Sequence, residues 1–298
     1  MNIFEFTNEV TDYINGHYEG YCASAVDTIK NNGVKYHGIT INHGKDTVLP
    51  TIYLEQFLIE YLGGTEMSEI VNEIMKIDSS AREVNIPDMS FYTDFSKIKD
   101  ALFLKLINTE KNDELLSQAP SRKFLDLSLV VYCDLSAFLE MNATVLVKND
   151  HLENLGITEE ELFDTATSNT RNMKIVKKDI ADVILNLQNK NERTNINPDD
   201  FLNEYGRMYV MTNKDMVFGA VTMIFDDVLD EFIMEKYSGV YIIPSSIHEV
   251  LLVPDLGNMD RDNLNSMIRE VNLTSLLEQE ILSFNAYYYS PKEGYSIV

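Results

Sequence analysis

The sequence predicts an α+β fold, in which a mainly antiparallel sheet is built from strand-strand-helix units and covered by helices, after a helical and hairpin N-terminal part. Three observations support this class. Apolar runs with strand-like alternation come in consecutive pairs joined by short polar turns, as in antiparallel hairpins. Segments with helical periodicity stand between these pairs. Hydrophobic residues make up 45% of the 298-residue chain, which is enough to bury a core in one large domain or two ordinary ones.

Residues 1–120 are expected to form the helical and hairpin region. Apolar side chains recur at helical spacing in residues 2–20, and Asn32-Gly33 stands between two alternating segments, where its positive φ values would form a tight turn. Ser96 is expected to cap the last helix of this region. The helices that follow the hairpin are expected at 52–62, 66–77 and 96–107, with a connection at 78–89.

Residues 121–298 are expected to form the sheet region, either as a second domain or as a continuation of one body with a surface loop near 186–200. Three strand-strand-helix units, near 125–169, 207–237 and 239–272, are expected to share one sheet with helices on one face. Thr158 is expected to cap the helix of the first unit. The expected strand pairs are 124–135 with 143–147, 208–211 with 217–225, and 240–243 with 250–253, and a closing strand is expected at 286–289.

Charge and cysteine usage limit the classes of partner and compartment. Acidic residues outnumber basic ones by 48 to 24, and the net charge of −24 opposes binding to nucleic acid and to anionic membranes. Cys22 and Cys133 stand far apart, so we expect no disulfide framework and a reducing compartment. The first residues carry no signal-peptide pattern and no apolar run is long enough to span a bilayer, which indicates a cytoplasmic protein.

The turn between the strands at 240–243 and 250–253 carries the residue types of a nucleophile, a base and an orienting carboxylate. These residues are Ser245, Ser246, His248 and Glu249. In an extended chain His248 and Glu249 point to opposite faces, and no Gly-x-Ser-x-Gly elbow surrounds either serine. We therefore favour serine hydroxyls that bond nearby backbone and shape the turn. A serine hydrolase centred on Ser245, Ser246 and His248 is the enzymatic alternative, and it requires a base from another segment.

His37 and His43 are the candidate metal ligands, because an even spacing on a straight strand puts both on one face. Six residues of strand separate them too far for a single ion, so we favour surface histidines without a metal. The segment 258–269 resembles a calcium loop, but Asn263 replaces the required glycine. Glycine-rich phosphate-binding motifs are absent from the sequence, and we expect no cofactor.

Two groups of acidic residues suggest further interpretations. Asp126 stands between leucines of an apolar strand and is expected on its solvated side. Four carboxylates gather at the start of a helix expected near 226–237, where they favour the positive end of the helix dipole and offer an acidic patch to a basic partner. The acidic patch consists of Asp226, Asp227, Asp230 and Glu231.

Short motifs are spread along nearly the whole chain. They are Asn31-Asn32-Gly33-Val34-Lys35, His37-Gly38-Ile39, Pro50-Thr51-Ile52-Tyr53-Leu54, Leu106-Ile107-Asn108, Phe124-Leu125-Asp126-Leu127, Pro244-Ser245-Ser246-Ile247-His248-Glu249-Val250, Arg269-Glu270-Val271-Asn272 and Tyr287-Tyr288-Tyr289. Together they resemble an uncharacterised family of bacterial proteins, a domain of unknown function common in gut Firmicutes. The resemblance implies a cytoplasmic bacterial protein and supplies no substrate and no catalytic residue.

We expect a non-enzymatic cytoplasmic protein that binds another macromolecule, a protein, through an acidic and tyrosine-bearing surface. The expectation rests on the net charge and on the absence of a catalytic motif. Two alternatives stay open at this point. One is the serine hydrolase described above, and the other is an acidic mimic of DNA, which requires carboxylates spaced like phosphates along one face.

Overall fold

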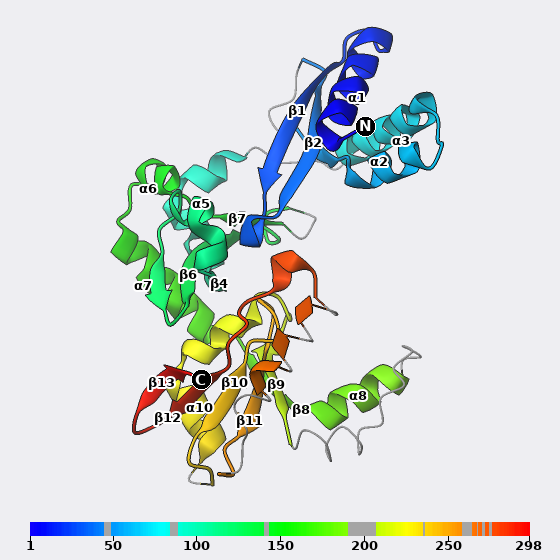
Figure 1. Cartoon of the computed structure of the whole chain (residues 1–298). Helices are drawn as coiled ribbons and strands as arrows, with labels where there is room; N and C mark the ends of the chain where they lie inside the picture. Colours follow the sequence, from blue (N-terminus) through cyan, green and yellow to red (C-terminus); the bar gives the residue numbers. More distant parts are fainter. Residues whose placement is uncertain are drawn as a thin grey trace. The chain divides into compact units, whose positions relative to one another are not determined.

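The computed structural model describes most of the chain and shows an α+β protein, as predicted. It describes residues 1–44, 49–83, 89–139, 143–189, 207–234, 236–257, 264–266, 268–269, 272–273 and 276–298. In these residues the strands form three sheets, and the strand pairs are antiparallel. Contacts divide the chain into two compact units (Figure 1): unit 1 has residues 1–89 and 138–141, and unit 2 has residues 90–137 and 142–298. That the chain divides near residue 120 into two independently folding domains stays a prediction.

Unit 1 is a three-stranded sheet packed against helices. Its elements are α1 (Ile3–His17), β1 (Cys22–Ile29), β2 (Lys35–Asn42), β3 (Ile52–Tyr53), α2 (Glu55–Leu62) and α3 (Met67–Glu83). Helix α1 lies along β1 and β2 (Figure 1) and begins with a capping box, in which the side chains of Asn2 and Glu5 each accept the other's backbone N–H. The predicted hairpin is confirmed, and Asn32 in its turn has a φ of 61°.

Two boundaries in unit 1 differ from the sequence prediction. Helix α2 begins at Glu55 rather than at residue 52, because Ile52 and Tyr53 pair with β2 as a short strand. Helix α3 continues to Glu83, so the connection expected at 78–89 is helical at its start. The polar side chain of Asp78, which reads as a loop residue, is buried and contacts a histidine within the unit.

Unit 2 contains the other two sheets. In the four-stranded sheet, β6 (Leu127–Asp134) pairs with β4 (Leu102–Asn108), β5 (Arg122–Phe124) and β7 (Thr144–Leu146). The six-stranded sheet has the order β13-β12-β10-β11-β9-β8. Its strands are β8 (Ile175–Asp179), β9 (Tyr209–Asn213), β10 (Val240–Ile243), β11 (Val250–Pro254), β12 (Tyr287–Ser290) and β13 (Gly294–Ile297).

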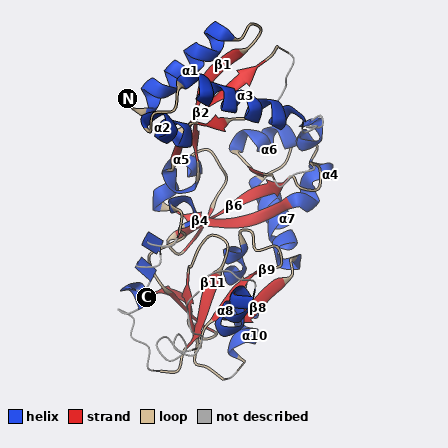
Figure 2. Cartoon of the chain, turned by 90° about the vertical axis from the view of Figure 1, so that its right-hand side faces the viewer, coloured by secondary structure: helices blue, strands red, loops and turns tan. Residues whose placement is uncertain are grey.

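Helices of unit 2 cover these sheets and connect their strands. They include α4 (Phe95–Ile98), α5 (Asp113–Leu116), α6 (Asn149–Leu155), α7 (Glu159–Asn172), α8 (Ile180–Asn189) and α10 (Asp226–Ile233). Helix α7 packs against β4 and β6 (Figure 2), and its Thr170 hydroxyl accepts the backbone N–H of Leu104 at 2.8 Å. The predicted cap of α7 is confirmed, because Thr158 accepts the N–H of Glu161.

The predictions of two elements in unit 2 are wrong. The helix expected at 96–107 is absent, because Asp94 rather than Ser96 caps the four-residue α4 and the chain then extends as β4. Alternate leucines along β4 fit the period of a strand as well as a helical stripe, and pairing with β6 decides between them. The strand expected at 217–225 is instead a 3-10 helix, Gly219–Ile224. Phe218 precedes it with a φ of 53°, which turns the chain away from an extended path.

The three expected strand pairs do not share one sheet, since the pair that begins at residue 124 belongs with β4 in a separate sheet. The hairpin of β10 and β11 and the closing strand β12 are confirmed in the six-stranded sheet. Helix α8 occupies the start of the loop expected near 186–200, and residues 190–206 and 258–263 lie outside the described residues. None of the described helices is both long enough and apolar enough to cross a membrane.

Candidate functional site

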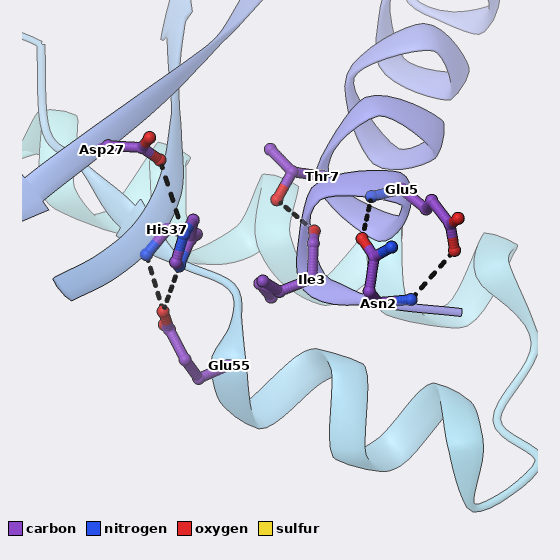
Figure 3. A network of polar contacts seen from close by, with 7 residues as sticks. All are labelled: Asn2, Ile3, Glu5, Thr7, Asp27, His37 and Glu55. Carbon is purple, nitrogen blue, oxygen red and sulfur yellow. Dashed lines mark hydrogen bonds and ion pairs between the residues drawn. The ribbon is translucent and has the colours of Figure 1, made fainter.

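In unit 1, His37 lies between two carboxylates (Figure 3). The register of the β1–β2 hairpin places Asp27 directly opposite His37, with 4.0 Å between Nε2 and Oδ1. Glu55, the first residue of α2, approaches from the other side, where its Oε1 lies 3.5 Å from Nδ1 and accepts the backbone N–H of His37 at 2.6 Å. The His37 side chain is only 14% exposed, so it is not a surface histidine.

A cavity of about 160 Å³ opens beside His37. It is lined by Phe4, Thr7 and Asn8 of α1, by Ala25, Val26 and Asp27 of β1, and by His37 itself. Phe4 stands edge-on to the imidazole, with 4.6 Å between ring centroids, and is 59% exposed. The side chain of Asp27 is 64% exposed, so a carboxylate and an aromatic ring both face solvent at this cavity.

Glu55 has an oxygen that is not used. Its Oε2 is buried and has no hydrogen-bond partner in the part of the chain that the structure describes. A buried carboxylate oxygen is ordinarily paired, because leaving it without a donor costs free energy. Glu55 Oε2, beside His37, is therefore a hydrogen-bond acceptor that no described residue uses.

His43 takes part in a different contact from His37. Its Nε2 lies 3.2 Å from the buried carboxylate of Asp78 on α3, and its ring lies 4.0 Å from that of Tyr21. The structure thus gives the two histidines separate carboxylates. Among the described residues, no three side chains of histidine, cysteine, aspartate or glutamate are grouped as a metal would require.

In unit 2, the turn between β10 and β11 uses its serines for backbone contacts. Ser246 Oγ accepts the N–H of His248 at 3.0 Å, and the N–H of Ser246 donates to the carbonyl of Glu249 at 3.2 Å. The N–H of Ser245 donates to the carbonyl of Ile243. Within the described residues no hydrogen bond joins either serine hydroxyl to a side-chain base. The turn does not assemble a nucleophile and a base.

His248 faces a different partner from the serines. Its Nδ1 accepts the N–H of Phe218 at 3.3 Å, and the two rings stack with 5.5 Å between centroids. Burial lowers the pKa of His248; Glu280 opposes this shift and Lys105 adds to it. Burial and then Glu280 raise the pKa of Glu249, so Glu280 acts on both candidate residues of the turn.

Lys105 is the functional candidate that the sequence prediction missed. It lies on β4, directly opposite the buried Val130 of β6, and its Nζ is 4.1 Å from the ring centroid of Phe218. Burial lowers its pKa to about 8. In the described part of the chain, Nζ makes no hydrogen bond and no ion pair. The available signal was a lysine between Leu104 and Leu106, which would have stood out had the segment been read as a strand.

The acidic patch on α10 has partners within unit 2. The pairs are Asp227 with Arg171 (2.8 Å), Glu231 with Lys177 (3.0 Å), and Asp230 with the hydroxyl of Tyr289 (2.8 Å). Asp226, the fourth residue of the patch, acts on Tyr295 of the same unit: burial first, and then the charge of Asp226, raise the pKa of the Tyr295 hydroxyl. Asp227 and Glu231, two of the four carboxylates of the patch, therefore have cationic partners within the unit.

Asp126 does not lie on a solvated strand face, so that prediction is wrong. It follows Leu125, whose φ is 56°, in the turn between β5 and β6. Its carboxylate accepts three hydrogen bonds, from Ser283 Oγ (2.8 Å), Asn285 Nδ2 (3.0 Å) and the hydroxyl of Tyr287 (2.7 Å). The adjacent Tyr288 donates in the same way to Asp255 at 2.9 Å. Neighbouring tyrosines of β12 thus hold carboxylates from different segments.

A model of a family of unknown function (DUF5688) matches residues 3–291 of the chain. No curated protein matches the chain, and no solved structure matches it. The match extends over both compact units.

Proposed function

The chain belongs to this family of unknown function, and we propose that it is a non-enzymatic, cytoplasmic bacterial protein that binds a basic partner protein. The cavity beside His37 takes a lysine or arginine side chain of that partner. One observation carries the proposal: an exposed carboxylate, Asp27, and an exposed aromatic ring, Phe4, flank the same small cavity.

The chemistry of this cavity suits a cationic side chain. Asp27 supplies an opposite charge, and the ring of Phe4 supplies a face on which an ammonium or guanidinium group can rest. The cavity of about 160 Å³ is large enough to take the end of one long side chain. An ion pair in such a partly enclosed place is less screened by water than one on an open surface.

The overall charge and the cysteines support the rest of the proposal. A net charge of −24 attracts a basic protein over long range and raises the rate of encounter. Cys22 and Cys133 are both free thiols, which a reducing compartment would preserve. The acidic patch on α10 adds to this negative charge, and Asp227, Asp230 and Glu231 also have partners within unit 2.

The two alternatives gain little support from the geometry. A serine hydrolase requires a base at Ser245 or Ser246, and the described residues bring none to them. A mimic of DNA requires free carboxylates in a regular row, whereas Asp227, Asp230 and Glu231 of the acidic patch have partners within unit 2.

The test is affinity capture from the source cells with wild type, Asp27→Asn, Phe4→Leu and, as a matched control, Asp12→Asn, which removes an exposed charge of the same helix-and-hairpin unit away from the cavity. We expect one basic protein to be enriched by wild type and by Asp12→Asn, and to fall at least about tenfold with Asp27→Asn, the equivalent of about 1.4 kcal/mol. Its lysine- and arginine-containing peptides should then bind wild type directly in a titration. Equal recovery by all four proteins would refute the proposal.

A further inference from the structure

Strand β1 forms one edge of the sheet in unit 1, and its outer side has no strand partner among the described residues. Its eight residues pair one to one with β2, without a bulge, and Asp27 is the one charged residue in them. Edge strands of native proteins are usually short, bulged or charged with lysine, which keeps other chains from adding to them. Edge strand β8 of unit 2 follows this rule with Lys177 and Lys178. Strand β1 does not, so its edge is open to a further strand.

Hydrogen bonds of the neighbouring strand show which backbone groups of β1 point outward. On β2, the N–H of His37 donates to Glu55 Oε1, and the carbonyl of His37 accepts the N–H of Leu54. Both groups therefore point away from β1, and the pair of His37 with Asp27 is a non-hydrogen-bonded pair of the hairpin. Asp27 then directs its own N–H and C=O to the outer side. Because this pattern repeats at every second residue, Ala25 does the same.

The side chain of Asn15 on α1 fills one end of this outer edge. Its amide accepts the N–H of Ala23 at 2.8 Å and donates to the carbonyl of Ala23 at 3.1 Å. These are the two bonds that a residue of an added strand would make. Ala25 and Asp27 are exposed, and no described residue makes such bonds to their backbone. The N–H and C=O groups of these two residues are therefore available to a further strand.

The open part of the edge borders the cavity beside His37. Ala25, Val26 and Asp27 line this cavity, and the Asp27 carboxylate lies on the same face of the sheet as the His37 ring (Figure 3). A residue that pairs with Asp27 from an added strand directs its side chain to that face. A lysine at this position reaches the Asp27 carboxylate and the ring of Phe4. Main-chain bonds at a sheet edge and a side-chain pocket beside it are the two elements of recognition by strand addition.

We propose that β1 binds an extended, basic segment of the partner protein as an additional strand, and that a lysine or arginine of this segment occupies the cavity beside His37. The proposal rests on the function proposed for that cavity and adds the backbone conformation of the bound segment. The charge of Asp27 and the net charge of −24 favour a basic segment over an acidic one. They also disfavour a second copy of this chain, whose β1 would bring its own Asp27 to the same edge.

The test uses the full chain and a short blocked peptide of alternating threonine and valine with lysine at its centre. Binding is followed by the amide NMR signals of the protein. One control peptide has norleucine in place of lysine, and the other keeps the lysine but is N-methylated at the lysine and at every second residue from it, which blocks one edge of the peptide. We expect the unmodified peptide to bind with a Kd at least about tenfold lower than that of either control. The signals of Ala25 and Asp27 should shift most, and their hydrogen exchange should slow.

A variant of the edge itself gives a second measurement. Ala25→Pro removes an N–H that points away from β2, a position at which an edge strand tolerates proline. It keeps Asp27 and Phe4, and we expect it to weaken binding of the unmodified peptide at least about tenfold while its circular dichroism stays that of wild type. Ala25→Ser is the matched control, because it keeps the N–H, and it should bind as wild type does. If Ala25→Pro does not fold, the methylated peptide on wild type still decides.

The outcomes separate this proposal from the function on which it rests. If the methylated peptide binds as tightly as the unmodified one and the norleucine peptide does not bind, the cavity takes a lysine without strand addition, and only the present proposal is wrong. If the lysine and norleucine peptides bind equally, the cavity does not select a cation, and both proposals are wrong. Absence of binding by the unmodified peptide overturns strand addition. A wild-type dimer in sedimentation that Ala25→Pro abolishes would assign the edge to a second copy and would also overturn it.

Discussion

His37 in unit 1 and His248 in unit 2 both pack against a phenylalanine next to β-structure, yet their nitrogens meet opposite kinds of group. The ring of His37 lies between the carboxylates of Asp27 and Glu55. The ring of His248 accepts a hydrogen bond from the backbone N–H of Phe218. The amine of Lys105 lies over the ring of Phe218. The same residue type therefore lies between two carboxylates in unit 1 and beside an aromatic ring and an amine in unit 2. The chemistry is set by the neighbours rather than by the histidine.

Each of these regions also contains a glycine with no room for a side chain. Substituting this glycine should give the largest loss of stability. Gly219→Ala would push a Cβ against Thr212 and the backbone of Asn213 and His248, and Gly38→Ala would place one 2.6 Å from the carbonyl of Ile52. We expect each to lower the free energy of unfolding by about 3 kcal/mol, with Gly219→Ala the more severe. Urea denaturation measures both.

Gly16→Ala is the matched control for the two glycine variants. Gly16 lies in α1 with open space around it, so alanine should raise stability by about 0.5–1 kcal/mol. If Gly219→Ala unfolds at the same urea concentration as wild type, the packing around residue 219 admits a Cβ and the expected clash does not occur.

Lys105→Met should stabilise unit 2 by on the order of 2 kcal/mol at pH 7, because it replaces an amine that has no ion pair among the described residues by an apolar side chain of similar length. The pKa of Lys105 is lower in the folded than in the unfolded chain, so the unfolded chain holds the proton more tightly. Wild-type stability should therefore rise between about pH 8 and 10.5, and the advantage of the variant should shrink over that window. Lys123→Met should show neither effect when both are followed by urea denaturation across pH.

Local signals predicted much of the fold. The cap of α7 by Thr158 and the turn at Asn32 need only neighbours in the chain, and both were expected correctly. The helix expected at 96–107 failed because alternating leucines satisfy two periods at once, and only the pairing of β4 with β6 selects one. Phe218 could not be expected, since a left-handed bulky residue depends on contacts from distant segments.

The candidate sites show the same difference between features with a local sequence signal and features that depend on long-range contacts. The sequence located the turn with Ser245 and His248, yet Lys105 enters that region from a strand more than a hundred residues earlier. Asp126 reads as a solvent-facing residue, and its three donors come from residues 283–287. Pairings of this kind are long-range in sequence and leave no local pattern.

Asp126→Asn and Glu55→Gln compare a fully used carboxylate with a partly used one. An asparagine at 126 would turn an NH₂ group toward donors that need an acceptor, and we expect a loss of about 1–3 kcal/mol. A glutamine at 55 can keep its carbonyl on the N–H of His37, and we expect about 0.5 kcal/mol or less. Denaturation in urea at pH 7 measures both, and a larger loss for Glu55→Gln would contradict this ranking.

His248→Gln should give the smallest effect, seen as a change in pH dependence. The pKa of His248 is lowered by burial, so the unfolded chain binds its proton more tightly, and this residue makes the fold less stable as the pH falls through about 6.5. Thermal unfolding at pH 7.5 and 5.5 should show a smaller drop for His248→Gln than for wild type. An equal or larger drop in the variant would show that His248 is hydrated in the fold.

The tyrosines of β12 have a spectroscopic consequence. The chain has 16 tyrosines and no tryptophan, so tyrosine dominates its near-ultraviolet absorbance. Burial, together with the carboxylates that accept hydrogen bonds from their hydroxyls, raises the pKa of Tyr287, Tyr288 and Tyr289, that of Tyr288 to about 12. Tyrosinate absorbance from these three rings should therefore appear at a higher pH in folded than in unfolded protein. An alkaline titration read at the tyrosinate band, compared with the same titration of urea-unfolded protein, then measures how strongly the fold keeps these hydroxyls protonated.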